Sequence, residues 1–392
     1  MTLSSFRRRM VPMYAAKFLR NFVFWYAVEK LFMTSIGFGS ESIALMVALY
    51  SAMSILMEIP SGILADRWSR KGVLILATVS LGASSLVGGL SYDVPVYLLS
   101  AILWGFFDAL ASGTDEAMVY DALLEEKGNA DEFEKEYGIY NAFGGIALFA
   151  AGLIGGLIGN SIGLRETYLL TVPLVLLAIP LVLRYRDATI HKHAAETALL
   201  THVRDTFSVV FRNPNLIWIL VTMFSIGLAN GLVGEMHQLW YIALSAPVLF
   251  FGVVGAVVNA TWGFGGIISR FFVTKRAIVA AIVATFVASL FLIVAKQYVL
   301  VLVAHFVIMI LANGLSVAMV AQMHRHLPSR VRAGASSAVN TVARFINIPL
   351  VLLFGWVAGQ YSVFTAAWIV VTLVGIGLAS ELNVRAKRNS VQ

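Results

Sequence analysis

Ionisable side chains interrupt several long apolar stretches of this chain, and they are its first candidates for chemistry. Glu29 and Lys30 stand in the first such stretch, Asp108 in the fourth, Glu235 in the seventh and Arg344 in the eleventh. A charge at the centre of an apolar span costs about 2.5–3.5 kcal/mol, so such residues are functional candidates by default. A carboxylate there can take up and release a proton. We predict that Asp108 binds a proton or the substrate, and that Lys30 pairs with Asp108 or with substrate.

Three further polar sets carry more specific expectations. Arg20 lies at a depth similar to that of Asp115 and Glu116, so we expect a gate or an ion pair within one bundle, with a structural role. His237 and His305 stand near the outer ends of their spans, where histidines act as proton relays or as polar tips at the surface. Asparagines inside the spans are expected to hydrogen-bond between helices.

Aromatic residues form the next group of candidates. Trp25, Tyr26 and Phe107 lie close to the charged positions and are predicted to line a substrate cavity. The alternative is ordinary packing or contact with lipid, because 12% of all residues are aromatic.

Other kinds of site are not indicated by the residue types. The chain has no cysteine, which excludes disulfides, thiolate metal ligands and a cysteine nucleophile. The two His-x-His pairs, which begin at His191 and His324, lack carboxylates at ligand spacing. No nucleophile–base set and no phosphate-binding loop is present. We therefore expect no enzyme, no metal and no cofactor, and an ion gradient as the energy source.

The composition indicates that helices inside a membrane position these residues. Hydrophobic residues make up 59% of the 392 positions and charged residues 12%, about half the charged fraction of a soluble domain. A helix needs about 20 apolar residues to cross a bilayer. Twelve such spans are predicted, at 13–36, 42–64, 72–91, 95–120, 138–160, 166–184, 215–240, 246–269, 277–295, 298–322, 333–357 and 362–383.

The spans predict an all-α integral membrane protein of two six-helix bundles. The N-terminal bundle occupies 1–184, a cytoplasmic linker with an amphipathic helix occupies 185–214, and the C-terminal bundle occupies 215–392. Of the 28 Lys and Arg residues, 22 fall in the loops on one side, and only Arg165 and Lys296 fall on the other. This bias places both termini in the cytoplasm and explains the net charge of +7 without nucleic acid. The acidic run from Glu125 to Glu136 is interpreted as a solvated helical extension.

A repeated motif supports duplication of the bundles. Gly62-Ile-Leu-Ala-Asp-Arg-Trp-Ser-Arg-Lys71 follows the second span, and a related segment that begins at Gly266 follows the eighth. The first segment resembles the loop signature of the major facilitator superfamily. The segments 58–62 and 112–121 resemble its bacterial drug-efflux branch. Two departures are the absence of an arginine from the fourth span, which has Asp108 instead, and the absence of proline from the glycine-rich fifth span.

The resemblance implies a cytoplasmic latch that closes the two bundles. Its residues are Gly62, Asp66, Arg67, Arg70 and Asp121. Asp66 is expected to face the start of the eleventh helix, and Arg70 is expected to pair with Asp121.

The resemblance also implies how the spans are grouped. Helices 1, 4, 7 and 10 surround a central cavity, and helices 2 and 11 adjoin, so Glu58 is expected to pair with Arg344 between the bundles. The alternative is that Arg344 attracts an anionic substrate. The glycines of helices 5 and 8 are expected to permit close packing of these helices.

The function predicted from these features is secondary active transport by alternating access. Proton-coupled export of amphipathic or drug-like small molecules is the leading interpretation. The alternatives are an uptake symporter for a small polar nutrient and a flippase for lipid or lipid-linked head groups. A receptor or scaffold is not favoured, because it would have a large soluble domain. We expect a monomer in the bacterial inner membrane, with a proton and a small molecule as partners.

Overall fold

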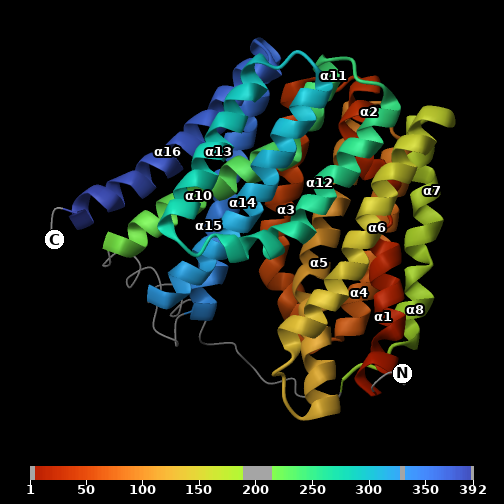
Figure 1. The fold of residues 1–392 in the computed structure, drawn as a ribbon. Coiled ribbons are helices and arrows are strands. Elements are labelled where there is room, and N and C mark those ends of the chain that lie inside the picture. Colours follow the sequence, from red (N-terminus) through yellow and green to blue (C-terminus); the bar gives the residue numbers. More distant parts are fainter. Residues whose placement is uncertain (1–4, 189–213, 327–331, 390–392) are drawn as a thin grey trace. The chain divides into compact units, whose positions relative to one another are not determined.

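The computed structural model describes residues 5–188, 214–326 and 332–389, and every regular element in these ranges is a helix (Figure 1). Eleven helices are long and apolar enough to cross a membrane. The predicted first span, which is broken in the structure, completes the set of twelve. The all-α membrane class predicted from the sequence is therefore confirmed.

The chain folds into two compact units. The N-terminal unit comprises residues 1–193 and 247–259, and the C-terminal unit comprises residues 194–246 and 260–392. The helices of the N-terminal unit are α1 (Ser5–Asn21), η1 (Phe24–Ala27), α2 (Glu29–Ser35), α3 (Ser40–Arg67), α4 (Arg70–Leu90), α5 (Val94–Lys127), α6 (Phe133–Ser161), α7 (Leu164–Leu176) and α8 (Ala178–Arg184).

The second half of the chain has a similar series of long helices. They are α10 (Pro214–Met236), α11 (Gln238–Ala243), α12 (Val248–Ile268), η2 (Ser269–Phe271), α13 (Lys275–Val294), α14 (Tyr298–His326), α15 (Arg332–Gln360) and α16 (Val363–Asn389). Within the C-terminal unit, α10 packs against α14, α15 and α16, and α13 packs against α14 and α16.

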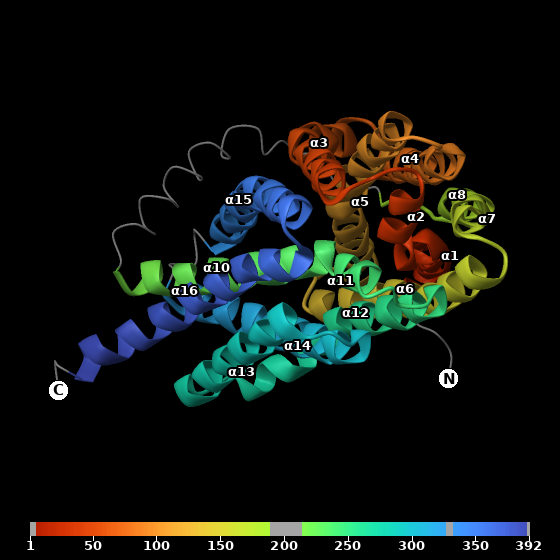
Figure 2. The same cartoon turned by 90° about the horizontal axis from the view of Figure 1, so that it is seen from above.

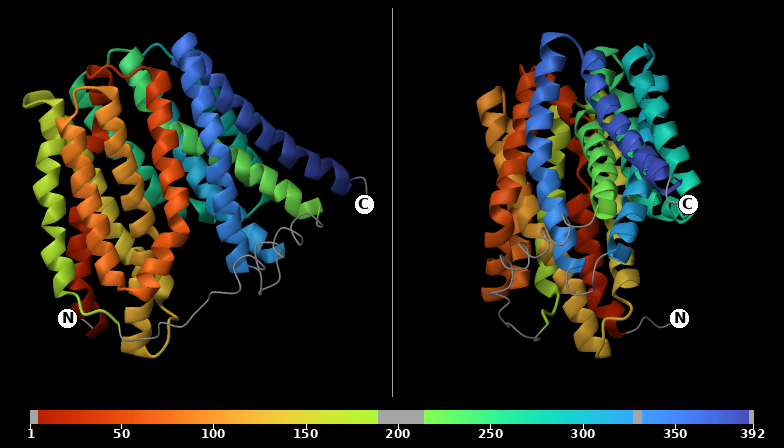
Figure 3. Two further views of the ribbon diagram at one scale, coloured as in Figure 1. Left: turned by 180° about the vertical axis from the view of Figure 1, so that it is seen from behind. Right: turned by 90° about the vertical axis from the view of Figure 1, so that its left-hand side faces the viewer.

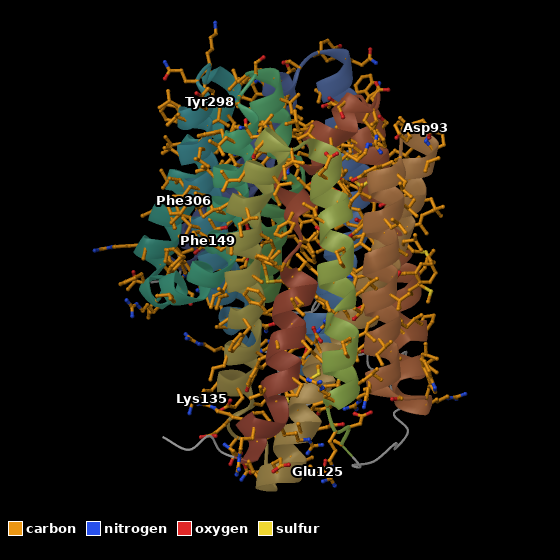
Figure 4. The ribbon with its side chains drawn as sticks, turned by 90° about the vertical axis from the view of Figure 1, so that its right-hand side faces the viewer. Asp93, Glu125, Lys135, Phe149, Tyr298 and Phe306 are labelled. Atoms are coloured by element: carbon orange, nitrogen blue, oxygen red, sulfur yellow. The ribbon has the colours of Figure 1, made fainter. Side chains whose placement is uncertain are left out.

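Helix packing in the N-terminal unit forms two groups. One group is α3, α4 and α5, which lie side by side in the view from above (Figure 2) and from behind (Figure 3). The other group is α1, α6 and α8, whose shared core with α4 and α5 contains Met10, Leu74, Met118 and Val182, and α7 packs mainly against α4. The unit extends from Asp93 at one end to Glu125 and Lys135 at the other (Figure 4).

The first span corrects the sequence prediction of one helix over 13–36. The α-helix ends at Asn21, a 3₁₀ turn follows, and α2 begins at Glu29. Two β-branched residues, Val23 and Val28, flank the turn, and such residues propagate a helix less readily. The amide of Phe24 donates to Thr171 Oγ1 at 3.1 Å, so packing against α7 replaces a helical hydrogen bond.

The boundary between the units differs from the predicted bundles in one respect. Residues 247–259, the first half of α12, belong to the N-terminal unit. The reason is backbone contact with α6, because a Cβ added at Gly152 would lie 2.7 Å from the amide of Ala256. A Cβ at Gly156 would lie 2.5 Å from Gly252 Cα. Close approach of the fifth and eighth spans through glycine is therefore confirmed. The predicted amphipathic helix of the linker lies mostly outside the described residues.

Candidate functional site

Asp108 lies on α5 beside a small group of aromatic side chains. Its carboxylate accepts a hydrogen bond from Ser54 Oγ of α3 at 2.5 Å. Trp104 stands one helical turn before Asp108, and Phe107 immediately precedes it. The two rings lie 6.2 Å apart between centroids. Because Asp108, Trp104 and Phe107 are all half-buried, this part of α5 keeps access to the surroundings of the unit.

Two tyrosines extend this group from neighbouring elements. Tyr26 of η1 accepts a hydrogen bond from Trp104 Nε1 at 2.7 Å. Tyr50 of α3 meets the Trp104 ring edge-on, with centroids 4.7 Å apart. A Cβ at Gly105 would lie 2.6 Å from the Tyr50 carbonyl oxygen, so glycine is what lets α3 and α5 approach this closely. We call Tyr26, Tyr50, Ser54, Trp104, Phe107 and Asp108 the Asp108 cluster.

The sequence prediction found part of this cluster and missed part. It named Tyr26, Phe107 and Asp108, and it missed Tyr50, Ser54 and Trp104. The spacing of Trp104 and Asp108 was a usable signal, because residues four apart share a helix face. Tyr50 and Ser54 come from α3, and only tertiary packing joins them to α5.

Trp25 does not have the cavity-lining position that the sequence suggested. Its side chain is 3% exposed and stacks on Tyr168 at 4.9 Å between ring centroids. Its indole N–H donates to Ser85 Oγ at 3.0 Å. Trp25 is therefore part of the interior of the N-terminal unit, because the broken first span turns this residue inward.

The charges of the first span form a local pair. Lys30 is buried, and its ammonium group donates to Glu29. Glu29 also accepts from the hydroxyl of Tyr97 at 3.4 Å. The predicted pairing of Lys30 with Asp108 or with substrate stays a prediction.

A second buried group of charges lies further along α5. Asp115 accepts from Arg20 at 2.7 Å and from Lys17 at 2.9 Å, and the hydroxyl of Tyr140 donates to it at 2.7 Å. Arg20 and Asp115 are 2% and 3% exposed, so this is an ion pair within the unit, as expected from the sequence. We call Lys17, Arg20, Asp115 and Tyr140 the Asp115 cluster. All of its hydrogen bonds join helices of one unit, which favours a structural role.

The predicted latch residues lie at the α3–α4 turn and on α5. Arg70 forms an ion pair with Asp121 and also donates to the Ala117 carbonyl at 3.0 Å, so the predicted Arg70–Asp121 pair is confirmed. Both partners belong to the N-terminal unit. Gly62 and Arg67 are exposed, and the side chain of Asp66 lies outside the described residues.

The acidic run from Glu125 to Glu136, which covers the end of α5 and the start of α6, is more than a solvated extension. Glu136 is 2% exposed and is held by Arg7 at 3.0 Å. Arg9 pairs with Glu125 at 2.8 Å and with Glu126 at 3.2 Å. Glu136 raises the pKa of the Arg7 guanidinium through their hydrogen bond and their opposite charges. The arginines before the first span thus anchor α1 to α5 and α6, which sequence spacing alone does not reveal.

The remaining charged candidates and the two histidines differ in how deeply they are buried. Glu235 and Arg344 are half-buried in the C-terminal unit, and Glu58 is exposed in the N-terminal unit. The predicted Glu58–Arg344 pair therefore stays a prediction. His305 is fully buried, and its Nδ1 lies 2.8 Å from the Tyr241 hydroxyl. His237 is also buried, so neither histidine is a polar tip at the surface.

The asparagines of the C-terminal unit bridge helices as expected. Asn230 of α10 donates to Asn313 of α14 at 2.8 Å. Asn313 donates in turn to Thr261 of α12 at 3.4 Å. Within the described residues, no group of three or more His, Asp or Glu side chains has the arrangement of a metal site.

Comparisons with known proteins agree with this architecture. The family model described as Major Facilitator Superfamily matches residues 10–350. The crystal structure of the nucleoside transporter NupG is similar with a TM-score of 0.77 and 15% identity, covering 96% of this chain and 98% of that chain. A bacterial homolog to the human lysosomal transporter Spinster, in an inward-facing and occupied conformation, has a TM-score of 0.74 and 14% identity, with 98% of each chain covered.

The two structural likenesses, at such low identity, show the fold. No curated protein matches the sequence. The family match spans most of the chain and carries the assignment. This protein belongs to the Major Facilitator Superfamily, and it is a multi-pass membrane transporter rather than an enzyme.

Proposed function

We propose that this transporter exports amphipathic organic cations in exchange for protons. The observation that carries the proposal is the Asp108 cluster, which combines a half-buried carboxylate with four aromatic residues from η1, α3 and α5. Aromatic faces attract cations by about 0.5–2 kcal/mol, and more strongly where water is excluded. A carboxylate beside such faces suits a molecule that is both apolar and positively charged.

The coupling to protons follows from competition for one carboxylate. Ionised Asp108 attracts a cation, and protonated Asp108 does not. Ser54 supports both forms, because a hydroxyl donates to a carboxylate and accepts from a carboxylic acid. A proton and a cation that bind alternately at Asp108 would move in opposite directions across the membrane.

Alternating access is the remaining part of the proposal. Transporters built from repeated bundles work by rocking one bundle against the other around a site near the midplane. The Arg70–Asp121 pair fixes the α3–α4 turn to α5 within the N-terminal unit. We also propose that both termini are cytoplasmic, that the membrane is a bacterial inner membrane and that the monomer is functional.

Transport by purified protein in liposomes tests the proposal. Ethidium flux is measured with and without an imposed pH gradient, in wild type, Asp108→Asn and the control Asp131→Asn, whose carboxylate is exposed. We expect gradient-driven flux in wild type and in the control, and its loss in Asp108→Asn. Flux that ignores the gradient would refute proton exchange, and unchanged flux in Asp108→Asn would refute the role of Asp108.

A second candidate is uptake of a small polar nutrient by proton symport. It is favoured by the amide network of Asn230, Asn313 and Thr261, because neutral polar groups recognise neutral polar molecules. Accumulation of a nucleoside or sugar in the same liposomes, driven by inward proton flow, would favour this candidate over export.

A further inference from the structure

From Ile217 to Met236, the part of α10 whose side chains the structure describes, partly accessible residues recur at helical spacing and the others are buried. Three glycines, Gly227, Gly231 and Gly234, are among these partly accessible residues and share one face of the helix. The other partly accessible residues of the helix are Ile217, Trp218, Ile219, Val221, Phe224 and Glu235.

These glycines leave room beside the helix. A Cβ added at Gly227 meets nothing within 4 Å among the described residues. At Gly231 it meets Asn347 Oδ1 at 3.8 Å, and at Gly234 it meets Met309 Cε at 3.7 Å, which are ordinary contact distances. Close helix packing therefore does not account for glycine at these three positions. We call Gly227, Gly231 and Gly234 the glycine face of α10.

An unsatisfied hydrogen-bond acceptor lies on the same side of the helix. Asn230 is 7% exposed, and its position is three residues from Gly227 and four from Gly234. Its amide nitrogen donates to Asn313, which fixes the orientation of the group. Its Oδ1 is buried and has no hydrogen-bond partner among the described residues. An unsatisfied buried acceptor is energetically unfavourable, so its presence here requires a physical reason.

A second orphan acceptor lies on the other side of the glycine face. Asn347 of α15 places its Oδ1 over Gly231, and that oxygen is also buried without a partner among the described residues. Glu235, one turn beyond Gly231, adds a carboxylate to the same face. The two unsatisfied atoms beside the glycine face are therefore both acceptors.

We infer that the glycine face of α10, between Asn230 and Asn347, is a substrate subsite for a hydrogen-bond donor, either a hydroxyl or an amine. The glycines supply the space, and the two amide oxygens accept from the donor. The inference rests on the proposed transport function and adds to it the chemistry of one substrate group.

Two lipophilic cations separate this inference from the proposed function. Ethidium carries two amino groups that donate hydrogen bonds, and tetraphenylphosphonium carries none. Each is transported in liposomes by wild type, Asn230→Leu, Asn347→Leu and Gly231→Leu. Asn347→Leu is included because it should fold normally: Asn347 Oδ1 has no hydrogen-bond partner among the described residues that the substitution would remove. Gly263→Leu is the matched control, because Gly263 also has open space but lies on α12.

We expect the three variants near the glycine face to raise the KM for ethidium by about three- to tenfold, the effect of one lost hydrogen bond. The KM for tetraphenylphosphonium should stay within about twofold for the two asparagine variants. Equal effects on both cations in Asn347→Leu, or no effect on either, would mean that a trapped water satisfies these oxygens, and would overturn the inference.

A binding measurement decides the matter if wild type moves neither cation. In that case cation export fails, and thermal stabilisation of the detergent-solubilised protein by uridine and by ethidium is compared in wild type and Asn347→Leu. Stabilisation that is lost in the variant supports the donor subsite independently of export. If neither compound gives stabilisation that depends on Asn347, the subsite is refuted.

Discussion

The two units differ in how their buried polar groups are paired. The N-terminal unit buries full charges and pairs them, as in the Asp115 cluster. The C-terminal unit joins neutral groups, such as Asn230 with Asn313 and Tyr241 with His305. The sequence carries the same contrast, because residues 1–184 contain 16 of the 21 acidic residues and residues 215–392 contain two. Two bundles with similar series of helices therefore hold these polar groups by different interactions.

Glycine is also used differently in α6 and in α10. In α6, Gly152 and Gly156 bring the backbone of α12 within contact distance. In α10, a Cβ at Gly227 would meet no described residue within 4 Å, and one at Gly231 would meet Asn347 Oδ1 at an ordinary contact distance of 3.8 Å. The same residue type therefore permits close helix contact at α6 and leaves room beside α10.

The largest expected effect comes from removing the central acid of the Asp115 cluster. Asp115→Asn leaves the buried guanidinium of Arg20 beside Lys17 without a compensating charge. Breaking one partner of a buried ion pair costs about 3–5 kcal/mol. We expect a strong loss of thermal stability in detergent, measured by a fluorescence melting curve.

The control for this loss is Asp131→Asn, whose side chain is exposed at the turn before α6. Its melting temperature should equal that of wild type. If Asp115→Asn also had the melting temperature of wild type, the Asp115 cluster would contribute no stability. The two units would then differ in composition alone.

Much of the fold could be predicted because apolar spans of about 20 residues leave few alternatives. The break at Val23–Val28 could not, because it depends on contacts with α6 and α7 rather than on local composition. The Arg20–Asp115 pair was predictable from equal depth in the membrane. Ser54 was not, since a lone serine on α3 becomes meaningful once Gly105 brings α5 against that helix.

Glycine substitutions sharpen the second comparison. Gly156→Ala places a methyl group 2.5 Å from Gly252 Cα, and relieving such overpacking costs about 1–3 kcal/mol. Gly231→Ala has room and gains helix propensity of about 0.5–1 kcal/mol. We expect opposite shifts in melting temperature. A loss of equal size in both variants would show that the glycine face of α10 is packed as tightly as α6.

A smaller effect tests the neutral network of the C-terminal unit. Tyr241→Phe removes the hydroxyl that meets His305 Nδ1 and leaves that buried nitrogen without this hydrogen bond. We expect destabilisation of about 1–2 kcal/mol, clearly less than for Asp115→Asn. Tyr361→Phe, at a side chain that is 71% exposed, is the matched control and should be silent. A Tyr241→Phe cost as large as that of Asp115→Asn would remove the distinction between the two kinds of polar interior.

The smallest expected effect comes from an exposed ion pair at the turn between α5 and α6. Lys127 lowers the pKa of Glu132 through a hydrogen bond and opposite charge. The stabilisation is therefore present above the pKa of the unfolded chain, and it is lost as the pH falls through the lower pKa of the folded protein. Glu132→Gln should lower the melting temperature at pH 7 by no more than about 1 °C, because exposed pairs contribute little and salt screens them. The gap should shrink as the pH falls below about 4.3, the ordinary pKa of glutamate. A larger gap, insensitive to salt, would show that the charges of the N-terminal unit stabilise it even where water reaches them, so that burial is not what distinguishes the Asp115 cluster.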